Sequence, residues 1–474
     1  MTYGLEEKKI HDVQEAFQSG DLTSLQLTTM YIERIANYDK SGIHLNAITE
    51  LNPDAFDIAA FLDRERKEGT IRGPLHGIPV LLKDNINTAD KMHTSAGSIA
   101  LSRSYALKDA HIVKLLRKAG AVILGKTNMT EFGHFMDQRM PGGYSSRGGI
   151  VKNPYGEEFQ TSGSSSGSAV AVAANLCMAS IGTETSGSIL SPAYHNSLVG
   201  IKPTIGLISR SGIVPITHTQ DTPGPLARTV EDAAILLDFL VGQDEADFAT
   251  LLRSKRGSSY VAHLDPNGLK GARIGINRGY EADFNDEQKD LFEQSIRALE
   301  KAGAIVVEGT NLPHLSTDKK VLLYEFKSAI NKYLADLGPE NEMKSLRHII
   351  AYNNKHHEKA LKYGQEWLIK AEFETTGTMT EPEYIEARLR DWRKARNGID
   401  QLLRDHELDA LFSPGVTDSP ALSGYPSIMT PAGYTRKGMP FGVCFTGTAF
   451  SESALVKLAF SFQEITKQRK APEL

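Results

Sequence analysis

The hydrophobic pattern divides the chain into a helical beginning, an alternating middle and a mixed end. Near the start, Thr23 and Ser24 precede apolar residues that recur roughly every 3.6 residues, which predicts an N-capped amphipathic helix. From residue 77 to about 230, short β-rich runs such as Ala121–Leu124 alternate with helical stretches such as Ala110–Lys118. Alternation of this kind predicts an α/β sheet with helices on both faces.

The pattern changes between about 240 and 400, where the chain is more charged and mostly helical. A helix over residues 287–302 and the apolar run Gly303–Val307 after it predict one αβ unit in this region. The end of the chain returns to sheet-like runs, followed by a helix from Ser453. These runs are Ala410–Phe412, Ser427–Met429 and Phe441–Phe445. We therefore expect the last part of the chain to rejoin the central sheet.

The composition of the 474-residue chain narrows the function classes. With 53 basic and 58 acidic residues, the formal charge of −5 gives no general basic surface for nucleic acid or an anionic membrane. There is no run of about 18 apolar residues and no signal-like start, so we expect a cytoplasmic protein. Cys177 and Cys444 are expected to be buried free thiols. No HxxxH or HExxH spacing occurs, and we predict neither a metal nor a cofactor.

Two loops rich in glycine and serine, residues 161–168 and 182–189, carry the candidate chemistry because they concentrate hydroxyl groups and flexible backbone amides. In the second loop, successive backbone N–H groups can point toward one developing oxyanion. The residues that supply these donors are Thr185, Ser186, Gly187 and Ser188. Upstream, the apolar run Ile78–Leu82 ends on Lys83, and burial there favours the neutral amine that a general base requires.

Less specific interpretations compete with the catalytic one. Serines in such loops often bond to nearby backbone, Ser164 can cap the helix after it, and lysines usually lie at the surface. Residues 163–167 also match the nucleophile elbow G-x-S-x-G, with Ser165 as nucleophile. An elbow needs a buried strand before it, whereas residues 153–160 form a polar loop. A phosphate-binding P-loop is excluded because neither loop continues as Gly-Lys-Ser/Thr.

Six motifs along the chain resemble those of the amidase signature family, serine hydrolases that use a Ser-cisSer-Lys triad. They are GIPVLLKDN (77–85), AGAVILGKTNMTEF (119–132), SGSSSGSA (162–169), IGTETSGSI (181–189), VGIKPTIGLISRSG (199–212) and DTPGPLARTVEDA (221–233). The order of the motifs is that of the family. The resemblance implies that Lys83 is the triad lysine, Ser164 the cis-serine and Ser188 the nucleophile, and the two serines keep the family's spacing of 24 residues.

The resemblance also implies one compact α/β domain over residues 1–474, with a mixed twisted sheet covered by helices on both faces. Four stretches are expected: a helical scaffold (1–70), the catalytic core (77–240), a helix-rich substrate cleft (241–400) and a return to the core (401–474). The implied reaction hydrolyses an amide to an acid and ammonia through a covalent acyl-enzyme. An ion pair between Glu184 and Arg228 is expected beneath the second loop.

Departures from the family pattern concern the substrate. Ser186 stands where many members have glycine or aspartate, and Leu190 where many have arginine, so we expect both to border a less charged substrate pocket. Ser166 and Glu184 are shared with a bacterial subset that resembles peptide amidases, whose substrates include C-terminally amidated peptides. The expected partner is therefore a small-molecule or peptide amide, and neither nucleic acid nor a membrane.

Two other functions remain open. The A subunit of glutamyl-tRNA(Gln) amidotransferase belongs to the same family and works only with partner subunits. It usually carries SGGSSGGS and GSDTGGSIRQPA, and both motifs differ here. A non-catalytic binding protein that retains the fold is disfavoured because Lys83, Ser164 and Ser188 are all present.

Overall fold

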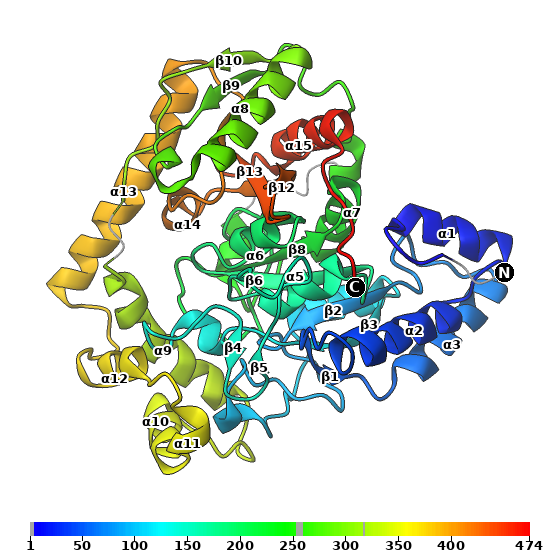
Figure 1. Cartoon of the computed structure of the whole chain (residues 1–474). Coiled ribbons are helices and arrows are strands. Elements are labelled where there is room, and N and C mark those ends of the chain that lie inside the picture. Colours follow the sequence, from blue (N-terminus) through cyan, green and yellow to red (C-terminus); the bar gives the residue numbers. More distant parts are fainter. Residues whose placement is uncertain (1–3, 253–258, 316–317) are drawn as a thin grey trace.

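A mixed sheet of eleven strands forms the centre of the protein in the computed structural model, which describes residues 4–252, 259–315 and 318–474 (Figure 1). The strands are β1 (Ile48–Leu51), β2 (Pro79–Lys83), β3 (Val122–Thr127), β6 (Ala179–Glu184), β7 (Val199–Lys202), β8 (Thr222–Ala227), β9 (Arg273–Ile276), β10 (Ile305–Val307), β11 (Ala410–Pro414), β12 (Ser427–Tyr434) and β13 (Pro440–Thr446). Their order across the sheet is β1-β3-β2-β6-β8-β7-β12-β13-β11-β9-β10. A separate two-stranded ribbon pairs β4 (Tyr144–Ser145) with β5 (Gly149–Ile150).

The position of the candidate site follows from the pairing of β2 with β6. These strands are parallel, and Leu82 pairs with Ile181. Because the carboxyl ends of parallel neighbours meet at one edge, Lys83 at the end of β2 lies beside the segment that leaves β6. All residues of β2 and β6 are buried, which explains the apolar run of β2 without a polar alternation.

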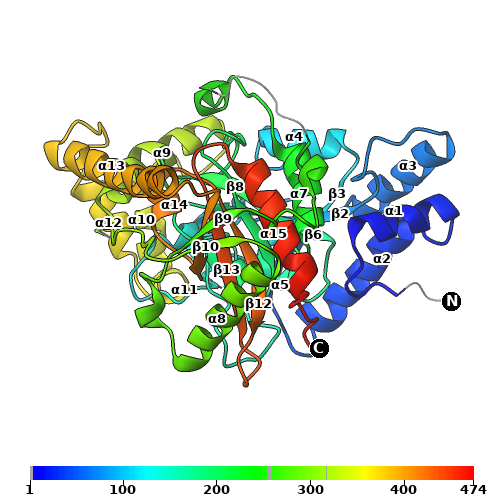
Figure 2. The same ribbon diagram turned by 90° about the horizontal axis from the view of Figure 1, so that it is seen from above.

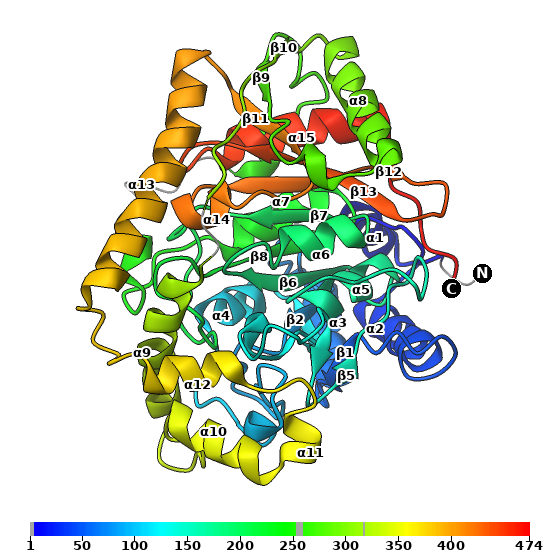
Figure 3. The same cartoon turned by 60° about the vertical axis from the view of Figure 1, so that its left-hand side comes forward.

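Helices flank the sheet (Figure 3). They are α1 (Ile10–Ser19), α2 (Ser24–Arg34), α3 (Ala55–Lys67), α4 (His111–Lys118), α5 (Ser166–Ala173), α6 (Leu190–His195), α7 (Val230–Leu240), α8 (Asp286–Lys301), α9 (Lys320–Asp336), α10 (Leu346–Lys355), α11 (His357–Ala360), α12 (Glu366–Phe373), α13 (Pro382–Asp405), α14 (Ser419–Ser423) and α15 (Glu452–Thr466). Shorter helical turns cover Ile35–Asp39, Ile99–Leu101, Glu131–His134, Phe248–Leu252, Tyr260–His263 and Glu281–Asp283. Seen from above, α1–α3 lie at one end of the molecule and α9–α13 at the other (Figure 2).

Two hydrophobic clusters hold these layers together. The larger cluster contains the central strands, α5, α6, α7 and α15. The second cluster joins α9, α10 and α12 to the segment around Phe132 and Phe135, and the Phe135 and Phe326 rings lie 4.6 Å apart. The α9–α12 region is therefore packed directly on the segment that follows β3, which also borders the candidate site.

The structure confirms the predicted α/β class with one large mixed sheet. Thr23 caps α2 by accepting a hydrogen bond from the Gln26 backbone N–H, and the helix expected over 287–302 is α8. The three sheet-like runs after residue 410 are β11, β12 and β13. The four stretches proposed for the domain remain a prediction.

Other expectations concern cysteines, metals and membrane segments. Cys177 and Cys444 are buried free thiols, as predicted. Within the described ranges, no cluster of three or more His, Cys, Asp or Glu side chains has the arrangement to hold a metal ion. No helix there has the length and apolar character to cross a bilayer.

Candidate active site

The side chain of Lys83 ends in a buried cluster of oxygen atoms. Lys83 is the last residue of β2 and is fully buried. Its Nζ donates to Ser164 Oγ at 2.7 Å and to Ser165 Oγ at 3.0 Å. It also lies 3.0 Å from the carbonyl oxygen of Thr183 and 2.9 Å from its hydroxyl. All four partners are neutral, so hydrogen bonds rather than an ion pair hold the amine in place.

Burial controls the protonation of this amine. Because the charged form loses its hydration, the pKa of Lys83 falls to about 7, although Asp221 and Glu184 oppose the shift. A large fraction of the lysine is therefore neutral near pH 7. A neutral amine donates its two N–H groups and accepts one hydrogen bond. Since the Thr183 carbonyl can only accept, it takes one N–H, and the lone pair is available to the Ser164 hydroxyl.

The first Gly/Ser loop presents two serines to Lys83. The peptide bond between Gly163 and Ser164 is cis, as the resemblance implies. Ser165 Oγ donates to the Thr183 carbonyl at 3.1 Å and accepts from the Thr183 backbone N–H at 3.2 Å. Its hydroxyl is therefore engaged by β6, whereas Ser164 borders an open cavity. No strand of the described chain leads into this loop, so the geometry of a nucleophile elbow is absent.

This difference between the two serines gives a testable prediction. We expect Ser165→Ala to lower kcat by about 10- to 100-fold, the cost of one hydrogen bond to a charged or chargeable amine, and to retain measurable activity. Initial rates of ammonia release measure this change. A Ser165→Ala protein with activity below 10⁻⁴ of the wild type (on the order of a lost nucleophile) would instead favour Ser165 as the nucleophile.

Ser188 lies in the turn between β6 and α6. Glu184 shapes this turn, because its Oε2 accepts hydrogen bonds from the backbone N–H groups of Ile189 and Leu190 at 2.7 and 3.0 Å. Gly187 has a φ of 77°, a left-handed conformation that glycine adopts without strain. No described residue accepts a hydrogen bond from the N–H groups of residues 186–188. These amides are free to donate to an oxyanion.

The two loops are joined through the backbone. The Ser165 N–H donates to the Ser188 carbonyl at 3.2 Å, and this bond holds the second loop beside Ser164. Within the described part of the chain, no hydrogen bond connects the hydroxyls of Ser164 and Ser188 directly. The structure therefore joins Lys83 to Ser164 by a direct contact and brings Ser188 alongside in the neighbouring turn.

A cavity of about 270 Å³ opens over this cluster. Ser164, Thr183 and Thr185 belong to its polar wall, which also includes charged residues such as Arg210 and Asp221, and Phe132 and Ile216 belong to its apolar wall. Such a combination of an apolar surface with a few convergent polar groups is typical of small-molecule sites. One wall of the cavity can contact an apolar group of a ligand, and the polar wall beside Lys83 can contact a polar group of the same ligand.

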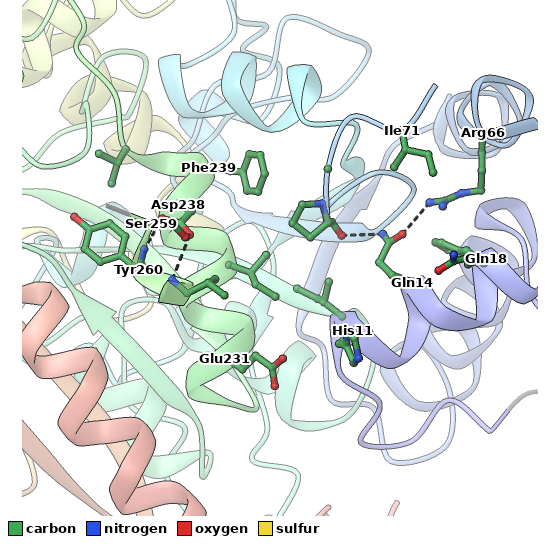
Figure 4. A pocket seen from close by; sticks show the side chains of 17 residues that line it. His11, Gln14, Gln18, Arg66, Ile71, Glu231, Asp238, Phe239, Ser259 and Tyr260 are labelled. Carbon is green, nitrogen blue, oxygen red and sulfur yellow. Dashed lines mark hydrogen bonds between the residues drawn. The ribbon is translucent and has the colours of Figure 1, made fainter. Parts of the chain in front are cut away.

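A larger cavity of about 960 Å³ lies between α1 and α7, on another part of the molecule (Figure 4). Its lining includes His11, Gln14 and Arg66 on one side and Phe239 and Tyr260 on the other, but none of the predicted site residues. Gln14 is already engaged by Arg66 and by the carbonyl of Pro74. The smaller cavity over Lys83 is therefore the candidate active site, despite its size.

The two residues expected to contact substrate differ in their placement. Ser186 is exposed in the turn before Ser188. Leu190 is buried at the start of α6 within the larger hydrophobic cluster, and it does not line the cavity over Lys83. A polar turn residue is thus accessible to a ligand, while Leu190 contributes to packing.

The expected ion pair between Glu184 and Arg228 is wrong. Arg228 donates to the carbonyl oxygens of Cys177 and Lys8 at 2.9 and 2.8 Å, and Glu184 is bound to the turn after β6. The reason is the register of β6 with β8. The strands are antiparallel, and Glu184 pairs with Thr222 at the start of β8. Arg228 follows the end of β8 and therefore lies at the opposite end of β6.

Two functional residues were not predicted from the sequence. Thr183 contributes two of the four contacts to Lys83. Asp221 accepts from the Thr185 hydroxyl at 2.6 Å and from the Ile216 N–H at 2.7 Å, and thus ties the turn that contains Ser188 to the cavity wall. Desolvation raises the pKa of Asp221. Both residues occur within the quoted motifs, but only the strand pairing shows which way they face.

Known proteins resemble this chain over most of its length. A family model described as Amidase matches residues 26–423. A probable amidase from Arabidopsis thaliana is 43% identical over 489 residues, which cover 100% of this chain and 92% of the relative. The A subunit of glutamyl-tRNA(Gln) amidotransferase from Pseudomonas syringae pv. syringae is 33% identical, with 95% of this chain and 96% of the relative covered.

Solved structures give the same result. Native peptide amidase from Stenotrophomonas maltophilia superimposes with a TM-score of 0.94 at 44% identity, with 99% of each chain covered. An amidase family protein from Bacillus anthracis has a TM-score of 0.95 at 38% identity, with 99% of this chain and 93% of the other covered. With the family model, the full-length relatives and a matching arrangement of sheet and helices, the chain belongs to the amidase family, hydrolases that act on amide C–N bonds.

Proposed function

We propose that the protein hydrolyses the terminal carboxamide of amidated peptides, with Ser188 as nucleophile, Ser164 as proton relay and Lys83 as base. The observation that carries the proposal is the buried lysine with a pKa near 7 in contact with a serine hydroxyl. A general base is most effective when its pKa lies near the working pH. Lys332 lines the cavity but is exposed, whereas Lys83 Nζ is buried and contacts the hydroxyls of Ser164 and Ser165 directly.

The first half of the reaction forms the acyl-enzyme. Ser188 Oγ attacks the carboxamide carbon while its proton passes to Ser164 Oγ and the Ser164 proton passes to Lys83 Nζ. The carbonyl oxygen becomes an oxyanion, which the N–H groups of Thr185–Ser188 stabilise by roughly 3 kcal/mol per donor. Catalytic hydrogen bonds are often long before substrate binds, so the Ser164–Ser188 contact is expected to shorten in the complex.

The second half releases both products. The tetrahedral intermediate collapses when the C–N bond breaks, and the leaving amide nitrogen receives the proton from Lys83 through Ser164, so that ammonia departs. Water then attacks the ester of Ser188 and gives one proton to the same relay. Collapse of this second intermediate breaks the ester bond, returns a proton to Ser188 and frees the carboxylic acid.

The peptide substrate is supported by similarity. The peptide amidase structures at 43–44% identity align over almost the whole chain, and one of them holds the competitive inhibitor chymostatin. The cavity of this chain has an apolar wall at Phe132 and Ile216, which suits uncharged aliphatic or aromatic side chains. We also propose a cytoplasmic location. The formal charge of −5 supports the further proposal that the protein has no nucleic-acid partner.

Ammonia release from a panel of amides tests the proposed function. We expect the isolated chain to hydrolyse amidated dipeptides with uncharged side chains at a higher kcat/KM than it hydrolyses glutamine. Ser188→Ala protein serves as the blank. Turnover of glutamine that requires two added partner proteins, without turnover of amidated peptides, would instead identify an amidotransferase component.

A further inference from the structure

Asn85 lies in the wall of the catalytic cavity, two residues after Lys83. Its backbone is fixed, because the Asn85 carbonyl accepts a hydrogen bond from the Val214 N–H at 2.8 Å. Only 5% of the residue is exposed. The catalytic roles proposed above do not use this side chain. Its position therefore needs a separate explanation.

The orientation of the Asn85 amide follows from its neighbours. Nδ2 donates to Thr183 Oγ1 at 3.0 Å and faces the Val214 carbonyl at 3.5 Å. The reversed orientation would place Oδ1 against the Val214 carbonyl, which is also an acceptor, so the network selects the orientation given. Oδ1 is consequently directed away from both groups.

This Oδ1 atom is a buried acceptor with no hydrogen-bond donor among the described residues. Buried polar atoms in native proteins are nearly always paired, so an unpaired one next to a binding cavity is available to a hydrogen-bond donor that enters the cavity. The missing partner is a donor, because a carbonyl oxygen can only accept. Asn85 is thus suited to accept a hydrogen bond from a substrate N–H group.

The surroundings of Asn85 favour a neutral donor over a cation, because the buried carboxylates of the cavity wall already accept hydrogen bonds or form ion pairs. Asp221 accepts from two threonine hydroxyls and two backbone N–H groups. Glu184 holds the turn after β6, and Asp247 pairs with Arg210. A charged ammonium would lose its hydration here without gaining a free buried carboxylate. A neutral amide N–H has no such cost.

We propose that Asn85 Oδ1 accepts a hydrogen bond from the peptide N–H of the residue that bears the scissile carboxamide. This inference rests on the proposed function and specifies its substrate as an N-acylated amino acid amide. A simple carboxamide, whose acyl part contains no N–H, leaves Oδ1 unpaired. Asn85 is then a substrate-binding residue that selects peptides over simple amides.

The Nδ2 group of Asn85 is linked to Lys83 through Thr183. Because Nδ2 donates to Thr183 Oγ1, which is in contact with Lys83 Nζ, a substitution of Asn85 also disturbs the base. A loss of activity alone would therefore not establish substrate binding. The informative quantity is the ratio of the kcat/KM values of two substrates on the same protein, because an effect on Lys83 changes both values and cancels in the ratio.

The experiment compares an N-acylated dipeptide amide with its depsipeptide analogue, in which an ester oxygen replaces the N–H next to the amidated residue. Ammonia release reports cleavage of the same terminal carboxamide in both. We expect the wild type to prefer the amide by about 10- to 100-fold in kcat/KM, because the ester cannot pair with Oδ1. In Asn85→Ala and Asn85→Ser, we expect the ratio to fall to about threefold or less.

Asn87→Ala is the matched control. Asn87 is also buried and close to the site in sequence, but its Oδ1 already accepts from the Tyr333 hydroxyl at 2.7 Å, so this variant should keep the wild-type ratio. Equal rates for the two substrates in the wild type, or an unchanged ratio in both Asn85 variants, would overturn the inference while leaving the proposed function intact. If the wild type hydrolyses neither compound, the proposed function itself is wrong.

Discussion

Replacing Ser188 with alanine is expected to lower kcat for ammonia release by about 10⁴- to 10⁶-fold, the range found when a nucleophilic serine is removed. The remaining N–H donors of the turn can still stabilise an oxyanion, but no covalent intermediate can form. The fold should be retained, because the Ser188 side chain makes no buried hydrogen bond in the described chain and the turn is held by Glu184. Steady-state rates measure the loss of activity, and unfolding midpoints measured on the same protein show whether the fold is retained.

Ser191→Ala is a suitable control for this variant. Ser191 lies three residues away in α6, and its hydroxyl is engaged by the Ser162 hydroxyl at 2.7 Å. Its loss should change kcat by less than about tenfold. Substantial activity in Ser188→Ala would remove Ser188 from the mechanism.

Lys83→Met is expected to be as inactive as Ser188→Ala while remaining folded. Methionine keeps most of the apolar stem that β2 packs into the core, and it removes an amine whose burial opposes its charged form. The four oxygen atoms around Nζ lose a donor, which offsets the gain from removing the buried amine. The unfolding free energy should therefore change only slightly in either direction. Ammonia release and thermal unfolding on one preparation separate the two effects.

The stability of the two proteins should depend differently on pH. The pKa of Lys83 is about 7 in the folded state and roughly 10.4 in an unfolded chain. Between these values the unfolded state binds more protons, so this lysine makes stability rise with pH across that window. Lys83→Met lacks this contribution and should show a flatter dependence. In the wild type, kcat/KM should fall below pH 7 as Lys83 becomes protonated.

Lys126→Met is the matched control for Lys83→Met. Lys126 is also fully buried, and burial lowers its pKa to about 8, but its Nζ bonds to the Ile86 carbonyl and the Thr94 hydroxyl. Its removal should affect stability more than catalysis. If Lys83→Met retains more than a tenth of the activity, or if Lys126→Met is equally inactive while folded, the assignment of the base is wrong.

The sequence predicts those parts of the site that depend on neighbouring residues. An apolar run that ends on lysine forms a buried strand with Lys83 at its end, and the Gly/Ser loops place Ser164 and Ser188 in turns. The fold class also follows from local alternation of β-rich and helical segments. These features require only short-range chemistry.

The remaining features depend on contacts between distant segments. Thr183 reaches Lys83 because β2 and β6 pair in one particular register, which no motif specifies. The expectation for Arg228 failed because β6 and β8 pair antiparallel, which places Arg228 at the opposite end of β6 from Glu184. Leu190 is adjacent to the nucleophile turn in sequence, but the direction of α6 places it in the core. Register and helix direction are properties of the assembled sheet.

Identification of the serine that carries the acyl group decides whether Ser188 is the nucleophile. An activated nitrophenyl ester of an N-acyl amino acid should give a burst of nitrophenol, because acylation is then faster than hydrolysis of the acyl-enzyme. After an acid quench during the burst, peptide mapping by mass spectrometry locates the added acyl mass. We predict this mass on Ser188 in the wild type and no adduct in Ser188→Ala. An acyl group on Ser165, or no burst and no labelled serine, would contradict this prediction.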